Sequence, residues 1–339
     1  MELGMLKTIT ANVSETMEQY NLLQVIWDQR IGHEDTLRSP VWPVVMSVGS
    51  YFALILPFMI TDLWGKGWKW IQKYKIQPEK DVTWPLVKKT VILTFWNNLL
   101  YVLPTGIAQC IWTPDTPLPA KAPSMFEFMW QMTAMTVIFD FQYFIWHYMH
   151  HRYRWLYKTF HAIHHEYNSP FSWVTQYLHP WELITVGFFT TVNPWLFHCH
   201  CMTTWAWMLW NVIISIEAHV GFDFPFSPCY WLPNWGGAIK HDMHHMKPLT
   251  NFQPYLTHWD KFFGTHCPAT TAGGVKPKAL LEYEQKRRER RFNKEGLFTI
   301  DGFINEDDSK SVNSKGAAPS NGHAANGRAP GETVGDKSE

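Results

Sequence analysis

The stretch HYMHHRYRWLYKTFHAIHH, residues 147–165, contains six histidines in nineteen positions. The segment directly before it, residues 128–146, reads FMWQMTAMTVIFDFQYFIW and is apolar and aromatic enough to suit a membrane. Imidazole is a good ligand for several transition metals. The two segments together predict a chain that leaves lipid and then presents metal-binding groups at its edge.

Charge is unevenly distributed along the 339 residues. Lys and Arg total 29 and Asp and Glu total 29, so the net charge of zero gives no electrostatic reason to expect a nucleic-acid partner. Three runs lack any charged residue: 39–61, 90–114 and 183–216. About 20 apolar residues span a bilayer as a helix, so the first two runs are long enough to cross it. A weaker third span, 126–146, carries Glu127 and Asp140.

The run 183–216 is too long for one untilted span. It predicts a hairpin that turns near Asn193-Pro194, with short or re-entrant arms. We therefore expect an all-α fold: an integral membrane helical bundle with a cytosolic, histidine-rich cap that binds metal. A soluble α-protein with apolar core helices is the alternative.

Basic residues indicate the orientation in the membrane. Residues 62–89 hold seven lysines, whereas residues 115–125 hold only Lys121. The positive-inside rule places the lysine-rich loop and the histidine-rich segments in the cytosol and the N-terminus in the lumen. The single N-x-S/T sequon, at Asn12, then lies on the luminal side and predicts a glycosylation site. The first residues lack the apolar region of a cleavable signal peptide, so the first apolar run would itself direct the chain to the secretory pathway.

Composition predicts four regions. They are a luminal N-terminal segment at 1–38, a membrane-embedded domain at 39–272, a charged cytosolic segment at 273–300 and a tail at 301–339. The tail is small, polar and rich in Gly and Pro, which predicts disorder. Residues 276–294 in the charged segment predict a solvated helix.

The histidines recur with one spacing, H-x-x-H-H, whose three histidines share one face of a helix. With 17 His in 339 residues, this pattern is expected about 0.04 times by chance. It occurs three times, at His147-His150-His151, His161-His164-His165 and His241-His244-His245. These boxes predict a metal site.

So many neutral ligands exceed the four of a structural zinc site and suit two adjacent metals. Two irons would supply electrons for splitting O2, and a site at the mouth of a membrane bundle suggests a lipid substrate. His198 and His200 alternate with Cys199 and Cys201 at the predicted luminal turn. We interpret them as structural residues, since no second pair of soft ligands accompanies them.

The motifs match a known family. The pattern HxxxH, HxxHH and a later HxxHH falls at 147–151, 161–165 and 241–245. Longer matching text includes DFQYFIWHYMHHRYRWLYKTFHAIHHEYNSPF, TQYLHPWEL, IEAHVGFDFP and YLTHWDKFFGT, with PVWPVV and KYKIQP near the first span. The chain resembles the membrane fatty acid hydroxylase/sterol desaturase superfamily, and within it the cholesterol 25-hydroxylases, from about residue 40 to residue 270.

The resemblance implies a non-haem di-iron, O2-dependent sterol monooxygenase of the endoplasmic reticulum membrane that converts cholesterol to 25-hydroxycholesterol. It implies as iron ligands His147, His151, His161, His164, His165, His241, His244 and His245. Two further histidines match ligand-like positions of the superfamily or of its sterol oxidases, namely His219 and His179. His150 lies outside HxxxH and is either a spare ligand or a support for the ligands. Lys240 stands where relatives often carry another histidine, so that position is not expected to bind metal.

Acidic residues near the boxes are candidates to orient the ligands, because a ligating histidine usually donates its other N–H to a carboxylate or carbonyl. The four candidates are Asp140, Glu182, Glu217 and Asp260. Asp140 lies two helical turns before His147, and an acid inside a membrane span generally needs a partner.

The chain shows no dinucleotide-binding or haem-attachment motif, so we expect an external electron donor, either a reductase or a small membrane haem protein, to dock near the boxes. Sterol, O2 and membrane lipid are the other expected partners. Two alternatives remain open. One is a sibling oxidase, such as a sterol C4-methyl oxidase, a sterol desaturase or a fatty-acyl hydroxylase. The other is a histidine-rich membrane metal transporter, although its ligands would normally lie at mid-span.

Overall fold

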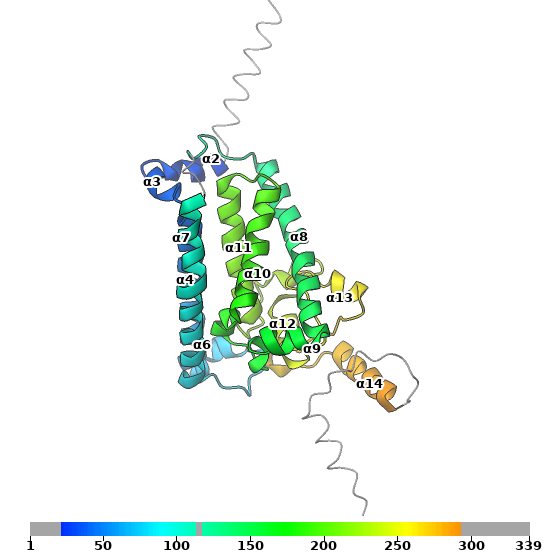
Figure 1. Ribbon diagram of the computed structural model, residues 1–339. Coiled ribbons are helices and arrows are strands. Elements are labelled where there is room, and N and C mark those ends of the chain that lie inside the picture. The colour runs from blue at the N-terminus through cyan, green and yellow to red at the C-terminus, as the bar shows by residue number, and fades with distance from the viewer. Residues whose placement is uncertain (1–21, 113–116, 293–339) are drawn as a thin grey trace, which may run out of the picture. The chain divides into compact units, whose positions relative to one another are not determined.

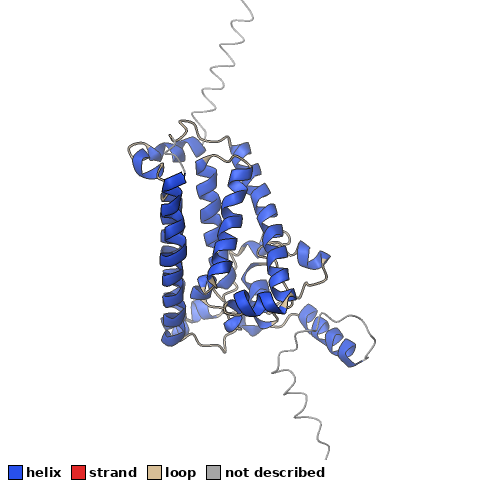
Figure 2. Ribbon diagram, in the orientation of Figure 1, coloured by secondary structure: helices blue, strands red, loops and turns tan. Residues whose placement is uncertain are grey.

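The computed structural model describes residues 22–112 and 117–292 of the chain. Within these residues the chain is helical, and isolated β-bridges take the place of strands (Figure 2). The all-α prediction is therefore confirmed for this part of the protein. The sequon at Asn12 and the tail at 301–339 lie outside the described residues, and the segment 1–38 is described only from residue 22.

Two long helices form one side of the bundle (Figure 1). The first is α4, Trp42–Trp64, which begins with a proline in its first turn, where a missing N–H costs nothing. The second is a continuous helix built from α6 (Trp84–Asn97), the π-helical segment η3 (Asn98–Val102) and α7 (Leu103–Trp112). A Cβ added to Gly106 of α7 would lie 2.8 Å from a methyl group of Val44, so glycine permits the close approach of α7 to α4.

Three further helices run side by side: α8 (Met125–Arg152), α10 (Pro180–Leu196) and α11 (Cys201–His219) (Figure 1). Each begins at a side-chain cap. Ser124 accepts the backbone N–H of Glu127 at the start of α8, as in a capping box. His179 and His200 accept the N–H groups of Trp181 and Met202 at the starts of α10 and α11.

Short elements make up the rest of the described chain, and several of them pack at one end of α8, α10 and α11, where α12 lies (Figure 1). They are α2 (Leu22–Trp27), η1 (Asp28–Arg30), α3 (Glu34–Leu37), η2 (Gly65–Gly67), α5 (Lys69–Gln72), α9 (Arg154–Leu156), η4 (Tyr157–His161), η5 (His164–Glu166), η6 (Ser172–Gln176), η7 (Pro228–Tyr230), α12 (Gly237–Met246), α13 (His258–Phe262), η8 (Ala272–Gly274) and α14 (Lys278–Phe292).

Two stretches are long and apolar enough to cross a membrane, Trp42–Gly67 and Trp84–Ala108. Only 17% and 22% of their most apolar windows are buried, whereas a core helix of a soluble protein would be mostly covered. Exposed apolar helices of this length, Trp64 and Trp84 at their ends included, fit association with a membrane.

The predicted turn near Asn193-Pro194 is wrong. The helix α10 continues through both residues to Leu196, and the turn lies between Leu196 and Cys201. Proline at 194 cannot bond to the carbonyl of Thr190, four residues back, which normally disfavours a helix. Here the indole N–H of Trp207 on α11 donates to that carbonyl at 2.9 Å, so the freed acceptor is satisfied and α10 persists.

Candidate metal centre

Nine histidines form two adjacent groups at the end of α8, α10 and α11 where α12 packs. The ligand atoms within each group lie within 4.8 Å of one another. We call them the five-histidine group, which comprises His147, His151, His161, His165 and His244, and the four-histidine group, which comprises His164, His219, His241 and His245. All nine are buried or nearly so.

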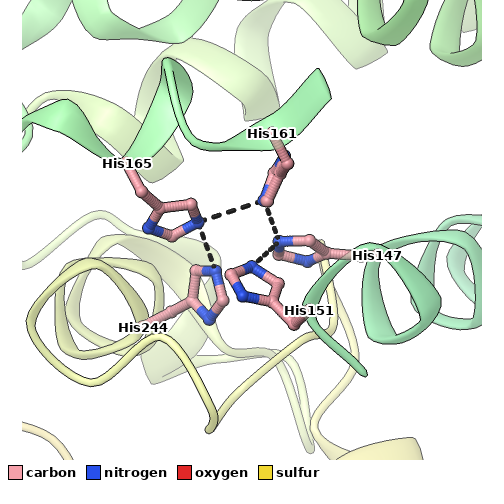
Figure 3. Close-up of side chains that lie close together, drawn as sticks. All are labelled: His147, His151, His161, His165 and His244. Carbon is pink, nitrogen blue, oxygen red and sulfur yellow. Dashed lines mark hydrogen bonds between the residues drawn. The ribbon is translucent and has the colours of Figure 1, made fainter. Parts of the chain in front are cut away.

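The five-histidine group draws on four elements (Figure 3). The last turns of α8 supply His147 and His151, and α12 supplies His244. His161 ends the π-helical segment η4, and His165 follows in η5. Single π-helical turns are frequent at functional sites because they re-aim side chains within a helical path.

The four-histidine group draws on three elements. His164 comes from η5 and His219 is the last residue of α11. His241 and His245 are one turn apart on α12. The Nε2 atom of His241 lies 2.8 Å from that of His219, which lies 3.3 Å from that of His164.

Backbone carbonyls orient four of the rings. The Nδ1 atoms of His147 and His244 lie 2.8 and 2.7 Å from the carbonyl oxygens of Phe252 and Thr250. In the other group, Nδ1 of His219 lies 2.8 Å from the Ser215 carbonyl and Nδ1 of His245 lies 3.0 Å from the Tyr167 carbonyl. A carbonyl only accepts, so each Nδ1 carries the proton and donates it. In the neutral ring, Nε2 then presents a bare lone pair.

A buried acidic side chain lies beside a fifth ring. Oε1 of Glu182, on α10, lies 3.0 Å from Nδ1 of His161, and both side chains are fully buried. Burial lowers the pKa of His161 well below its usual value, as it does that of His244, to about 3, so both rings are neutral. The Thr250 carbonyl holds the proton of His244 at Nδ1, so the Nε2 lone pair of His244 points into the group.

Converging lone pairs fit a cation. The Nε2 atoms of His147 and His161 lie 3.0 Å apart, and the neutral His147 ring has no proton at Nε2 because its Nδ1 donates to the Phe252 carbonyl. Nε2 of His245 is buried and has no hydrogen-bond partner among the described residues. Buried acceptors left in this state cost free energy unless a metal takes them up. The donor set, all neutral imidazole nitrogens, suits Fe, Zn, Cu or Ni.

Two histidines that the sequence offered as ligands lie outside both groups. His150 has both ring nitrogens engaged: Nδ1 donates to the Trp146 carbonyl at 2.7 Å and Nε2 accepts from the indole N–H of Trp181 at 3.3 Å. His179 caps α10 by accepting the backbone N–H of Trp181 at 3.1 Å. Both ring nitrogens of His150 and Nδ1 of His179 are therefore occupied in this arrangement. Lys240 also lies outside both histidine groups. Its ammonium group donates to the Cys267 carbonyl at 2.9 Å.

The three other acidic candidates accept hydrogen bonds from backbone N–H groups and not from the grouped histidines. Asp140 accepts the N–H groups of Tyr255 and Leu256, both at 2.9 Å, and so ties the chain after α12 to α8. Glu217 accepts from Ser227 and from the N–H of Ala238 at the start of α12.

Asp260 supports a histidine indirectly, through the backbone of Phe252. It accepts the N–H groups of Phe252 and Gln253 at 2.9 Å each, and the Phe252 carbonyl orients His147. The orienting carbonyls of Phe252, Thr250, Tyr167 and Ser215 were missed by the sequence reasoning, because a backbone oxygen leaves no mark in the residue pattern.

At the far end of α11, His200 is structural, as the sequence suggested. Its Nδ1 accepts from Met202 and its Nε2 lies 3.0 Å from the Lys121 carbonyl. The described residues place no metal-ligand group around it.

Comparisons with known proteins agree with this site. The fatty acid hydroxylase family profile matches residues 132–265, which include all nine grouped histidines. The chain is 50% identical over 249 residues to "Cholesterol 25-hydroxylase-like protein 1, member 2" of Danio rerio, covering 73% of this chain and 90% of that protein. No solved structure gave a significant match.

Two less similar relatives carry related names. The chain is 37% identical over 304 residues to the cholesterol 25-hydroxylase-like protein of Caenorhabditis elegans, covering 89% of this chain and 97% of that one. It is 36% identical over 245 residues to human cholesterol 25-hydroxylase, covering 72% and 90%. The chain belongs to the cholesterol 25-hydroxylase-like family of the fatty acid hydroxylases.

Proposed function

We propose that this protein is a non-haem di-iron sterol monooxygenase that hydroxylates cholesterol at C25. The observation that supports the proposal most directly is the pair of adjacent histidine groups, each with lone pairs that converge. One iron would be held by the five-histidine group and the other by the four-histidine group. The names of the relatives support a sterol as the substrate.

The reaction fixes what must be supplied from outside the chain. Hydroxylation converts R–H, O2, two electrons and two protons into R–OH and water. When bound, a pair of irons supplies the redox chemistry that activates O2, a task for which zinc, with no redox chemistry, is unsuited. An external carrier must provide the two electrons.

The protein's own residues position the ligands and keep the site dry. The carbonyls of Phe252 and Thr250 fix the tautomers of His147 and His244, and Glu182 lies beside Nδ1 of His161. Buried Phe144 and Phe252 line the same region, and the Phe252 ring lies 5.7 Å from both His147 and His244. An apolar shell of this kind suits an aliphatic sterol tail and excludes water from the reacting carbon.

We propose the membrane topology that the apolar runs and the basic residues predict. The protein is multi-pass in the endoplasmic reticulum membrane, with the N-terminus and Asn12 in the lumen and the histidines at the cytosolic edge. The lysines between the two apolar stretches support this orientation. A sterol could then enter the site laterally from the bilayer.

The test is lipid mass spectrometry of cells that express the chain, compared with cells that express His161→Ala, together with the iron content of the purified proteins. We expect 25-hydroxycholesterol and about two irons per chain only for the wild type. A desaturated or C4-oxidised sterol, or a hydroxylated fatty acid, would instead assign the chain to a sibling reaction. Metal flux into vesicles without any oxidised lipid would favour a transporter.

A further inference from the structure

The segment between the first two histidine boxes is exposed, basic and aromatic. Residues 152–158, which we call the basic connection, read RYRWLYK and include α9. Arg152, Arg154 and Lys158 are exposed, and the side chains of Tyr153 and Trp155 are 57% and 67% exposed. The segment contains no acidic residue.

The three cations of the basic connection are unpaired. Within the described part of the chain, none of Arg152, Arg154 and Lys158 forms a salt bridge or a side-chain hydrogen bond. Other surface cations here do have carboxylate partners, as Lys66 has Asp81 and Lys247 has Glu284. Three unpaired positive charges on one short segment produce a local positive potential that attracts an acidic surface.

The basic connection also lies against the candidate metal centre. Arg152 directly follows His151 in the sequence, and the segment ends three residues before His161. The Tyr157 ring lies 5.3 Å from the His151 ring, 6.2 Å from that of His161 and 6.1 Å from that of His165. One partly buried side chain therefore separates this part of the surface from three members of the five-histidine group.

We propose that the basic connection is the docking surface for an acidic one-electron carrier protein. This inference rests on the proposed function, whose reaction consumes two electrons per O2. The metal centre accepts these electrons in two one-electron steps. Either two reduced carrier molecules dock in turn, or one carrier docks, is reduced again and docks a second time. Electron tunnelling weakens steeply with distance, so a carrier docked here reaches the metal centre over a short path. Arg, Tyr and Trp are also the residues most enriched among energetic anchors of protein interfaces.

The test measures electron transfer without sterol or O2. The metal-loaded protein in neutral-lipid nanodiscs is mixed anaerobically with a soluble acidic haem protein in its reduced form, and stopped-flow absorbance follows haem oxidation. For the wild type we expect a second-order rate constant that falls as salt is added. For Arg152→Glu/Arg154→Glu/Lys158→Glu we expect a rate constant lower by about tenfold or more at low salt, with little salt dependence.

A matched control reverses three exposed cations elsewhere: Lys69→Glu/Lys88→Glu/Lys286→Glu. It changes the net charge equally and should retain the wild-type rate within about twofold if the location of the charges decides the effect. Reduction by dithionite, which needs no docking surface, should be equal in all three proteins. If dithionite no longer reduces the glutamate variant, the neutral Arg152→Gln/Arg154→Gln/Lys158→Gln variant replaces it. For that variant we expect a rate of haem oxidation between those of the wild type and the glutamate variant, with a weaker salt dependence than the wild type.

Several outcomes would overturn the docking surface. One is a glutamate variant, or a glutamine variant, that accepts electrons from the haem protein as fast as the wild type. Another is normal transfer combined with weaker binding to phosphatidylserine vesicles, which would assign the segment to an anionic lipid surface. If dithionite fails to reduce even the wild-type centre, the di-iron proposal itself falls, and that result is separable from a defect confined to the variants.

Discussion

The first and third histidine boxes have the same H-x-x-H-H spacing but contribute differently to the metal centre. In both, the histidines four residues apart stay together: His147 with His151, and His241 with His245. The middle histidine differs. His244 leaves its own pair and joins the five-histidine group, whereas His150 joins neither group.

Helix geometry explains the shared part of this behaviour. Residues four apart on a helix differ in direction by about 40°, whereas neighbouring residues differ by about 100°. A pair at i and i+4 therefore points at one target and the histidine at i+3 points to its side. For His244, a second group of imidazoles lies on that side. For His150, the indoles of Trp146 and Trp181 lie there instead.

The largest expected effect comes from removing a middle histidine that belongs to a group. His244→Ala should reduce sterol hydroxylation to background and lower the iron content, because it removes a neutral ligand whose ring is held by the Thr250 carbonyl. Labelled-sterol turnover and metal analysis of the purified protein measure both effects. Membrane insertion should be unchanged, and wild-type turnover would remove the third box from the mechanism.

The next effect tests Glu182, the one acidic side chain among residues 22–112 and 117–292 that pairs with a grouped histidine. Glu182→Gln keeps the size of the side chain but replaces the carboxyl group beside Nδ1 of His161 with an amide. We expect metal affinity or activity to fall by about 10–100-fold. Glu217→Gln is the matched control, since that buried acid contacts Ser227 and Ala238 rather than a histidine. Equal losses in the two variants would indicate a general effect of buried acids.

The sequence could identify most of the grouped histidines because helical spacing is encoded in the residues themselves. The H-x-x-H-H repeats identified eight of the nine grouped histidines, and His219 was added by resemblance to a family. Spacing could not predict that His150 is engaged by Trp181, thirty-one residues away, because that contact depends on how α10 packs on α8.

The fold was predicted with similar limits. Charge-free runs located the long helices, but Pro194 suggested a turn where the helix continues. The compensating donor, the indole of Trp207, lies on the following helix and acts only through tertiary packing. The backbone carbonyls of Phe252 and Tyr167 that orient two of the rings could not be predicted either, because they too reach the histidines only through tertiary packing.

A smaller effect is expected from the middle histidine that joins neither group. His150→Ala should leave the iron content at the wild-type value, since its two nitrogens bond to Trp146 and Trp181 rather than to a metal. The indole N–H of Trp181 loses its partner, which costs about 1 kcal/mol of stability. Measuring the iron content of His150→Ala and His244→Ala side by side tests whether only the grouped histidine binds metal. Loss of iron from His150→Ala would return this residue to the ligand set.

The smallest effect is expected at His179, which caps α10 and belongs to neither histidine group. His179→Ala leaves the N–H of Trp181 without its side-chain acceptor at the start of α10. Caps of this kind contribute about 1 kcal/mol, so the Tm should fall by about 2–4 °C while metal content and turnover persist. His179→Asn is the control, because asparagine is a preferred cap and should restore the Tm. If His179→Asn recovers the Tm but not the iron, His179 binds metal in the loaded protein, and the distinction between grouped and ungrouped histidines fails at this position.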